Sequence, residues 1–318
     1  MAGSPGRAVW SLEWHTGREM YPYINLGFAH IGTFGLLLWF GAVCATWVLH
    51  RNFQRGGVDA DALNVVVFTV IAGILGAKLW HELENIPELV LAWRQIMLPG
   101  WNHPMEILVG FFAWFKAGFA WFGGLTAGII TLVAQAMALR LNGLRGVKAA
   151  LRMLDLAAPA AAVGYGVGRI GCLTSGDGDY GINTTLPWGV HMANGKDFYH
   201  RALVPPNPPD ALVQPTPVYE LLYSLAIAWW LWRRGSKPTP VGMLTGLYLV
   251  LSGVGRFLVE FVRVNPKLYW HHTMSNAQLA ALGSVAAGVV MILITRRNAA
   301  VIAEPLAAQG HEPKVATA

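Results

Sequence analysis

Long apolar stretches dominate the pattern of hydrophobic and polar positions along the chain. Seven of them contain few charged residues and approach the length of about 20 residues that a helix needs to cross a bilayer. These stretches are residues 26–49, 63–80, 119–139, 156–173, 218–232, 241–261 and 277–294. A shorter apolar stretch, 107–116, is interpreted as an interfacial or re-entrant segment that leads into the third span. The pattern predicts an all-α, polytopic membrane protein with seven transmembrane helices.

The composition agrees with this pattern and argues against several functional classes. Hydrophobic residues make up 54% of the 318 residues and charged residues only 13%, whereas soluble domains carry about 25% charged residues. These figures disfavour a soluble enzyme, a disordered chain and a water-exposed nucleic-acid-binding protein. The two cysteines, Cys44 and Cys172, are too few for a disulfide framework.

Basic residues predict the orientation, because cytoplasmic loops carry an excess of Lys and Arg. Twelve lie in the compact loops after the first, third and fifth spans and in the C-terminal tail: Arg51, Arg55, Arg140, Arg145, Lys148, Arg152, Arg233, Arg234, Lys237, Arg296, Arg297 and Lys314. Eight lie in the N-terminal arm and the longer loops: Arg7, Arg18, Arg94, Lys116, Lys196, Arg201, Arg263 and Lys267. We therefore expect the N-terminus outside and the C-terminus in the cytoplasm. The net charge of +6 then reflects this bias and requires no nucleic acid.

Three regions complete the predicted organisation. Residues 1–23 form an arm with four aromatic residues, which favours an interfacial position, and no cleavable signal peptide is evident in it. The seven-span membrane domain covers 24–296, with a long outer loop at 174–216 rich in Gly, Asn and Pro. The Ala-rich segment 297–318 is expected to be a disordered cytoplasmic tail.

Charged residues within the apolar stretches are the first candidates for a functional site, since a central Arg or Asp costs about 2.5–3.5 kcal/mol on insertion. Arg169 is one, near the outer end of the fourth stretch. Gly164 and Gly168 share a helix face and allow another helix to approach closely. Arg169 is therefore either a functional cation or a residue that extends outward from a tight helix crossing.

The sixth stretch contains Arg256 and Glu260, which share one face of a helix, with Arg263 three residues further on the same face. One interpretation is a structural ion pair. The other is an anion site at the outer leaflet, in which Glu260 orients Arg256. Arginines on two different helices could then hold one phosphate from two directions.

Two carboxylates, Asp177 and Asp179, lie in a Gly-rich segment directly after Arg169. They are candidates for a metal site, for an acid or base, or for capping a turn. The spacing is similar to the start of a calcium loop, but the terminal Glu of such a loop is missing. We therefore predict no metal site and no separate cofactor.

Several of these segments together resemble the prolipoprotein diacylglyceryl transferase family. The first is Gly168-Arg169-Ile170-Gly171, followed ten residues later by Gly181. The others, in chain order, are Gly76-Ala77-Lys78-Leu79, Phe122-Gly123-Gly124-Leu125, Pro215-Thr216-Pro217-Val218-Tyr219-Glu220 and Arg256-Phe257-Leu258-Val259-Glu260-Phe261-Val262-Arg263. Their order and spacing hold over residues 24 to 296, and the predicted topology matches that of the family.

The resemblance implies transfer of the diacylglyceryl group of phosphatidylglycerol to the thiol of a lipobox cysteine in prolipoproteins, with release of glycerol phosphate. It implies a site toward the outer leaflet of the bacterial cytoplasmic (inner) membrane. Its expected partners are phosphatidylglycerol, prolipoprotein signal peptides and other membrane lipids. The candidate catalytic residues are Arg169, Arg256, Glu260, Asp177 and Asp179. The candidate lipid-binding residues are Arg169, Arg256, Phe34, Gly123, Gly124, Gly181, Tyr219 and Glu220.

The chain departs from the family pattern at several polar positions. Phe122 replaces the His of the His-Gly-Gly motif, Cys172 replaces an Asn, and Phe34 replaces a functional Tyr. Ser252 stands where the family has a Tyr, and Gln214 where a His is expected. The arginines are thus kept while proton-handling groups are lost.

No residue aligns directly with the Glu of the family signature, so either Asp177 or Asp179 is the candidate base. Two other functions remain open on these residues. One is a divergent phospholipid-dependent transferase with another acceptor. The other is a non-catalytic protein that binds or transports anionic lipids.

Overall fold

Each of the seven apolar stretches forms a helix in the computed structural model, which describes residues 23–25, 30–116, 118–139, 141–175, 179–191, 212–265, 267–269 and 273–297. The corresponding helices are α1 (Thr33–Arg55), α2 (Ala62–Glu84), α5 (Trp121–Leu139), α6 (Gly146–Ser175), α7 (Thr216–Gly235), α8 (Met243–Val259) and α9 (Asn276–Arg297). The mostly helical fold class is confirmed.

Five of these helices, α1, α2, α5, α6 and α9, are long and apolar enough to cross a membrane. The apolar helix α8 has 17 residues, and the 20-residue α7 contains a glutamate and two arginines. Many large apolar side chains on the helices are exposed, including those of Trp39, Leu75 and Leu293. Such surfaces suit contact with lipid rather than water.

The remaining described elements are short. Two further helices, α3 (Ile86–Met97) and α4 (Pro104–Lys116), lie between α2 and α5, and a 3-10 turn, Leu141–Gly143, precedes α6. The predicted interfacial stretch 107–116 is part of α4. Six strands form three antiparallel pairs: β1 (Tyr23–Asn25) with β2 (His30–Gly32), β3 (Val190–His191) with β4 (Leu212–Val213), and β5 (Lys267–Tyr269) with β6 (Met274–Ser275).

Two predicted boundaries were wrong. The first span was expected to begin at residue 26, but α1 begins at Thr33, because β2 directly precedes it and pairs with β1. The fourth span was expected to begin at 156, but α6 begins at Gly146 and therefore includes buried Arg152 and Asp155. The predicted span began after these charged residues. In the folded protein, contacts with other segments allow the helix to include them.

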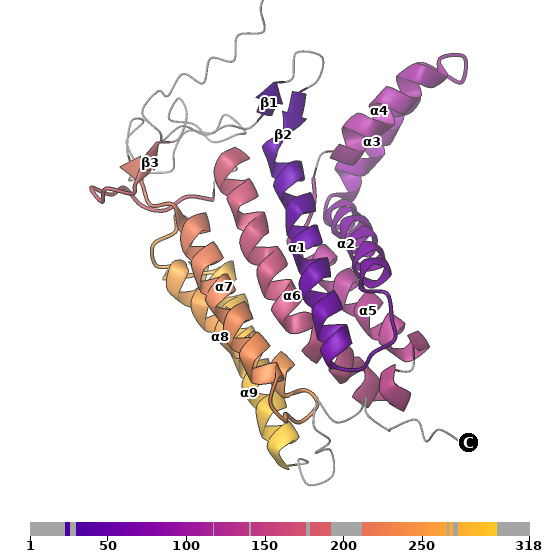
Figure 1. Cartoon of the computed structure of the whole chain (residues 1–318). Helices are drawn as coiled ribbons and strands as arrows, with labels where there is room; N and C mark the ends of the chain where they lie inside the picture. Colours follow the sequence, from indigo (N-terminus) through magenta and orange to yellow (C-terminus); the bar gives the residue numbers. More distant parts are fainter. Residues whose placement is uncertain are drawn as a thin grey trace, which may run out of the picture.

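The long helix α6 lies at the centre of the arrangement (Figure 1), with α7, α8 and α9 on one side and α1, α2 and α5 on the other. It packs against α1, α5, α7 and α8. Its buried face is rich in alanine, including Ala149, Ala158 and Ala162, and small side chains let helices approach closely. Between α2 and α5 the approach requires glycine, since a Cβ on Gly123 would lie 2.3 Å from the carbonyl oxygen of Gly76.

Asp155 fixes α6 against the start of α8. Its carboxylate accepts hydrogen bonds from the backbone N–H of Gly242 (2.6 Å) and from the N–H and hydroxyl of Thr245 (both 2.7 Å). Asp155 therefore lies inside α6 and caps α8. This contact sets the register between the two helices that carry Arg169 and Arg256.

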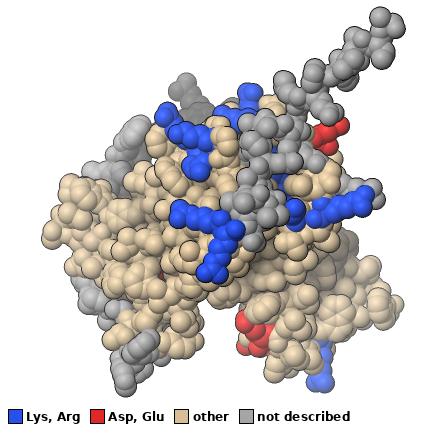
Figure 2. Space-filling view, turned by 90° about the horizontal axis from the view of Figure 1, so that it is seen from below, with Lys and Arg blue, Asp and Glu red and all other residues tan. Residues whose placement is uncertain are grey.

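Basic residues gather at one end of the molecule. The last turns of α1, α7 and α9 end there, with Arg51, Arg55, Arg233, Arg234, Arg296 and Arg297. Viewed from below, Figure 2 shows Lys and Arg side chains spread over this face, with few acidic ones among them. We refer to it below as the basic face.

Candidate active site

Three arginines and three carboxylates meet at the end of the molecule opposite the basic face. The last turns of α6 and α8 and the first turn of α7 lie there. Arg169 lies on the last turns of α6, Glu220 near the start of α7, and Arg256 on the last turn of α8. Glu260 caps the C-terminus of α8. Asp179 and Arg263 come from the loops that follow α6 and α8. We call these six residues the arginine–carboxylate cluster.

Glu220 lies at the centre of the cluster, with a fully buried side chain (0% exposed). Its Oε2 is 2.6 Å from Nε of Arg169, and its Oε1 pairs with Arg256. The hydroxyl of Tyr165 donates to Oε1 at 3.1 Å, and a guanidinium nitrogen of Arg263 lies 3.9 Å from it. A buried carboxylate needs such partners to offset its lost hydration.

Arg169 joins several parts of the site. Besides Glu220 it pairs with Asp179, and it donates to the Tyr165 hydroxyl at 3.2 Å. Its guanidinium also lies 5.0 Å from the centre of the Tyr165 ring and 3.6 Å from the sulfur of Cys172. The structure therefore places Arg169 in a partnered site at the end of α6 rather than extended into solvent.

The predicted helical pair of Arg256 and Glu260 is confirmed, with 3.0 Å between a guanidinium nitrogen and Oε2. Glu260 also accepts hydrogen bonds from the Asn265 amide (2.6 Å) and the Ser275 hydroxyl (2.7 Å). The prediction that Arg263 continues the same helix face was wrong. Helix α8 ends at Val259, and Arg263 pairs with Asp179 instead.

Backbone pairing holds the two loops of the site together. Ile182 N–H donates to the carbonyl of Val262 at 2.9 Å, and Val264 N–H donates to the carbonyl of Tyr180 at 3.2 Å. Between them Gly181 pairs with Arg263. A Cβ on Gly181 would lie 2.7 Å from the Val262 carbonyl oxygen, which leaves room only for glycine. This pairing brings Asp179 and Arg263 together.

The remaining predicted residues fall into different surroundings. Asp177 lies outside the described residues. Tyr219 accepts a hydrogen bond from the Trp188 indole (2.7 Å) and donates to the Gln214 side chain (2.9 Å), one residue from Glu220. Phe34 is partly exposed in the first turn of α1, and its ring would lie 3.3 Å from a Cβ on Gly171.

Gly123 and Gly124 lie elsewhere, in the crossing of α5 with α2. The atoms that a Cβ on either glycine would meet belong to Gly73, Gly76, Ala77 and Trp80 of α2. The packing of α5 against α2 therefore explains why these two positions hold glycine. A role of these glycines in lipid binding stays a prediction.

Three polar residues of the site were missed by sequence reasoning. Tyr165 had a usable signal, because it lies four residues before Arg169 and so shares its helix face. Asn265 and Ser275 had none, since only the loops after α8 bring them to Glu260.

The exposed fractions of the side chains in the cluster indicate which charge it presents to its surroundings. The side chains of Arg169 and Arg256 are 17% and 20% exposed, whereas those of Glu220 and Glu260 are 0% and 2% exposed. Two arginine side chains from different helices are therefore partly exposed, while two of the carboxylates are buried. Such an arrangement suits a phosphate, which accepts hydrogen bonds from planar guanidinium groups. Asp179, 16% exposed, adds a carboxylate beside them.

Comparison with known proteins gives consistent results. A family model described as prolipoprotein diacylglyceryl transferase matches residues 22–294. Phosphatidylglycerol–prolipoprotein diacylglyceryl transferase 2 of Clostridium perfringens is 30% identical over 238 residues, covering 74% of this chain and 80% of the relative. The corresponding enzyme of Clostridium tetani is 27% identical, covering 83% of this chain and 92% of the relative. That of Methylibium petroleiphilum is 29% identical, with 86% and 92% coverage.

Proposed function

Because the chain belongs to the prolipoprotein diacylglyceryl transferase family, we propose that it transfers the diacylglyceryl group of phosphatidylglycerol to the lipobox cysteine of prolipoproteins. The observation that carries this proposal is the pair of partly exposed arginines, Arg169 and Arg256, held by the buried carboxylate of Glu220. The proposed partners are phosphatidylglycerol and the signal peptides of prolipoproteins.

The arginines act on the leaving group. A bond forms between the cysteine sulfur and a glyceryl carbon, and the bond between that carbon and a phosphate oxygen breaks. The electron pair of the broken bond goes to the phosphate, which leaves as glycerol phosphate. Arg169 and Arg256 stabilise the negative charge that develops there. Glu220 and Glu260 position the two guanidinium groups without reaching the surface.

A carboxylate of the loop after α6 accepts the thiol proton, since a thiol attacks only as the thiolate. Asp177 and Asp179 are the candidates, and the contacts of Asp179 favour it. It pairs with Arg169 and Arg263. A phosphate bound by Arg169 competes for this guanidinium and leaves Asp179 with Arg263 as its ion-pair partner, so that its other oxygen can accept a proton. Phosphate binding would thus prepare the base.

The distribution of charge supports a proposed position in the membrane. All seven helices α1, α2 and α5–α9 cross the cytoplasmic membrane of a bacterium, with the basic face toward the cytoplasm. The N-terminus then lies outside and the C-terminus inside. The arginine–carboxylate cluster, at the other end of α6, lies at the depth of the outer leaflet, where phosphatidylglycerol reaches it sideways between helices.

The test combines the purified protein with phosphatidylglycerol and a lipobox peptide, and measures released glycerol phosphate and the mass of the peptide. We expect both products from the wild-type protein and from Arg296→Ala, a control on the exposed end of α9. We expect neither product from Arg169→Ala.

The alternatives predict other outcomes. Glycerol phosphate without a modified peptide would indicate a different acceptor. The absence of both products, with phosphatidylglycerol still bound, would indicate a non-catalytic lipid-binding protein. Either result would overturn the proposed transferase activity.

A further inference from the structure

Two tryptophans and two arginines form a compact group on the basic face, between α1 and α7. The rings of Trp47 and Trp232 are stacked, with centroids 6.5 Å apart and planes 2° from parallel. The Arg55 guanidinium lies 3.7 Å from the Trp232 ring centre, and the Arg51 guanidinium 5.7 Å from that of Trp47. Stacking on aromatic rings holds both guanidinium groups in place.

These two arginines differ from those of the arginine–carboxylate cluster in their partners. Arg55 donates to the Ser236 hydroxyl at 3.4 Å, and Arg51 donates to the Gln54 side-chain oxygen at 3.5 Å. Within the described part of the chain, neither forms an ion pair with a carboxylate. Two exposed cations whose described partners are neutral keep an uncompensated positive charge, which favours an anion.

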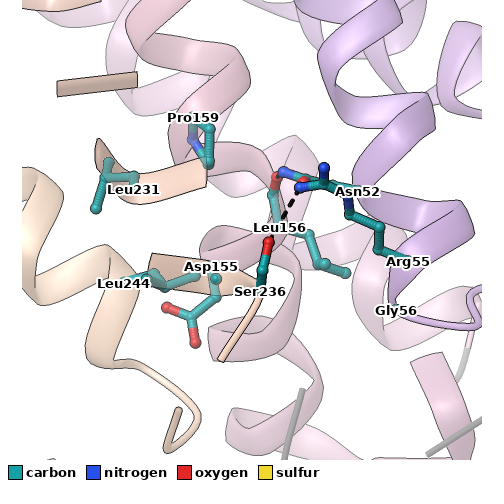
Figure 3. A pocket seen from close by; sticks show the side chains of 10 residues that line it. Asn52, Arg55, Gly56, Asp155, Leu156, Pro159, Leu231, Ser236 and Leu244 are labelled. Atoms are coloured by element: carbon teal, nitrogen blue, oxygen red, sulfur yellow. Dashed lines mark hydrogen bonds between the residues drawn. The ribbon is translucent and has the colours of Figure 1, made fainter. Parts of the chain in front are cut away.

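The group borders two hollows. One, of about 430 Å³, is lined by Trp47, Arg51, Gln54, Arg55 and Trp232. The other, of about 240 Å³, lies between α1, α6, α7 and the start of α8. Figure 3 shows Arg55 beside this second hollow, with a hydrogen bond to Ser236.

Asp155, the carboxylate that lines the second hollow, does not oppose an anion strongly. Both of its oxygens already accept hydrogen bonds from Gly242 and Thr245 at the start of α8. These N–H and O–H donors offset part of the negative charge of the Asp155 carboxylate.

A groove of about 480 Å³ runs between α1 and α2. His50 and Asp61 line its polar end beyond Trp47, and residues such as Trp39, Val43, Val67 and Ile71 line its apolar part. Along α1 the groove extends from His50 to Trp39, which are 11 positions apart, or about 16 Å at 1.5 Å per residue. This is about half of the roughly 30 Å hydrocarbon core of a bilayer, the depth of a single leaflet.

We propose that this end of the protein binds an anionic phospholipid, at a second site separate from the arginine–carboxylate cluster. Arg51 and Arg55 hold the phosphate, Trp47 contacts the glycerol backbone, and one acyl chain lies in the groove between α1 and α2. Charge complementarity selects the anionic headgroup, and the continuity of the groove with the arginines through Trp47 selects a lipid over free phosphate. The site does not depend on the proposed transferase activity.

The test measures phosphatidylglycerol retained by the purified, delipidated protein in native mass spectra, with phosphatidylcholine as a neutral comparison. The variant Arg51→Gln/Arg55→Gln is matched by Arg296→Gln/Arg297→Gln, which removes two exposed charges from the same face. For the phosphatidylglycerol molecule that is retained longest, we expect the first variant to have a Kd about tenfold higher than that of the wild-type protein. Two charge-assisted contacts are lost in this variant. We expect the matched variant to equal the wild-type protein.

A second variant tests the groove. Val43→Trp fills it from an exposed position on α1, and should weaken binding of long-chain phosphatidylglycerol while leaving a short-chain form unaffected. Equal retention by the wild-type protein and Arg51→Gln/Arg55→Gln, or equal loss in the two double variants, would overturn the site. Unchanged long-chain binding by Val43→Trp, or displacement by glycerol phosphate alone, would overturn the assignment to a lipid.

Discussion

Arg169 and Glu220 are 51 residues apart in the chain, yet Nε of Arg169 lies 2.6 Å from Oε2 of the glutamate. The carboxylate is fully buried and its other oxygen pairs with Arg256. One glutamate on α7 therefore sets the relative position of two arginines on α6 and α8. For a reaction that transfers a group away from phosphate, this positioning determines where the developing negative charge is stabilised.

Replacing Glu220 with glutamine should lower both stability and activity. The substitution removes the charge that compensates two arginines, and breaking a buried ion pair by removing one partner costs about 3–5 kcal/mol. Thermal unfolding in detergent and the transferase assay measure the two effects. Glu106→Gln, at an exposed position on α4, is the control. An unchanged Tm and full activity for Glu220→Gln would show that the glutamate does not organise the site.

Asp179→Asn should reduce turnover while leaving phosphatidylglycerol bound. General base catalysis contributes about 10²–10⁴-fold to a rate, so we expect a loss of kcat in this range. Asp177→Asn is the companion variant, because sequence reasoning left the base open between the two. Full activity in both variants would contradict a base in this loop, and a loss confined to Asp177→Asn would move the assignment to that residue.

Gly181→Ala should destabilise the pairing of the two loops that hold Asp179 and Arg263. The added methyl group would lie 2.7 Å from the Val262 carbonyl oxygen and 2.8 Å from Cβ of Gln214, so the backbone must shift. We expect activity to fall more than Tm, because the shift is local to the site. Gly283→Ala on α9, where a Cβ meets nothing within 4 Å, should be neutral or slightly stabilising.

Asp155→Asn should lower the free energy of unfolding with little direct effect on chemistry. The amide offers one acceptor where the carboxylate offers two, so a backbone N–H at the start of α8 loses its partner, at a cost of about 1–3 kcal/mol. The measurement is thermal unfolding, with activity assayed well below the transition. A Tm equal to that of the wild-type protein would mean that this cap does not stabilise α8.

The sequence by itself determined the seven long apolar helices of this protein and the charged residues that are unusual within them. Apolar runs of sufficient length form helices because a bilayer leaves few other ways to satisfy backbone hydrogen bonds. Charges are costly in such runs, so Arg169, Arg256 and Glu260 were identifiable as candidates without a structure. The pair of Arg256 and Glu260 also followed, because a spacing of four residues is a property of one helix.

Only the tertiary structure decided how these residues are connected. The depth of Glu220 beneath both arginines depends on how α7 packs against α6 and α8, and the pairing of Arg263 with Asp179 depends on α8 ending at Val259. The same holds for Asp155, which caps a helix that begins 88 residues later in the chain. Such contacts join segments that are distant along the chain. Neither the periodicity of apolar residues nor the spacing of residues along one helix predicts them.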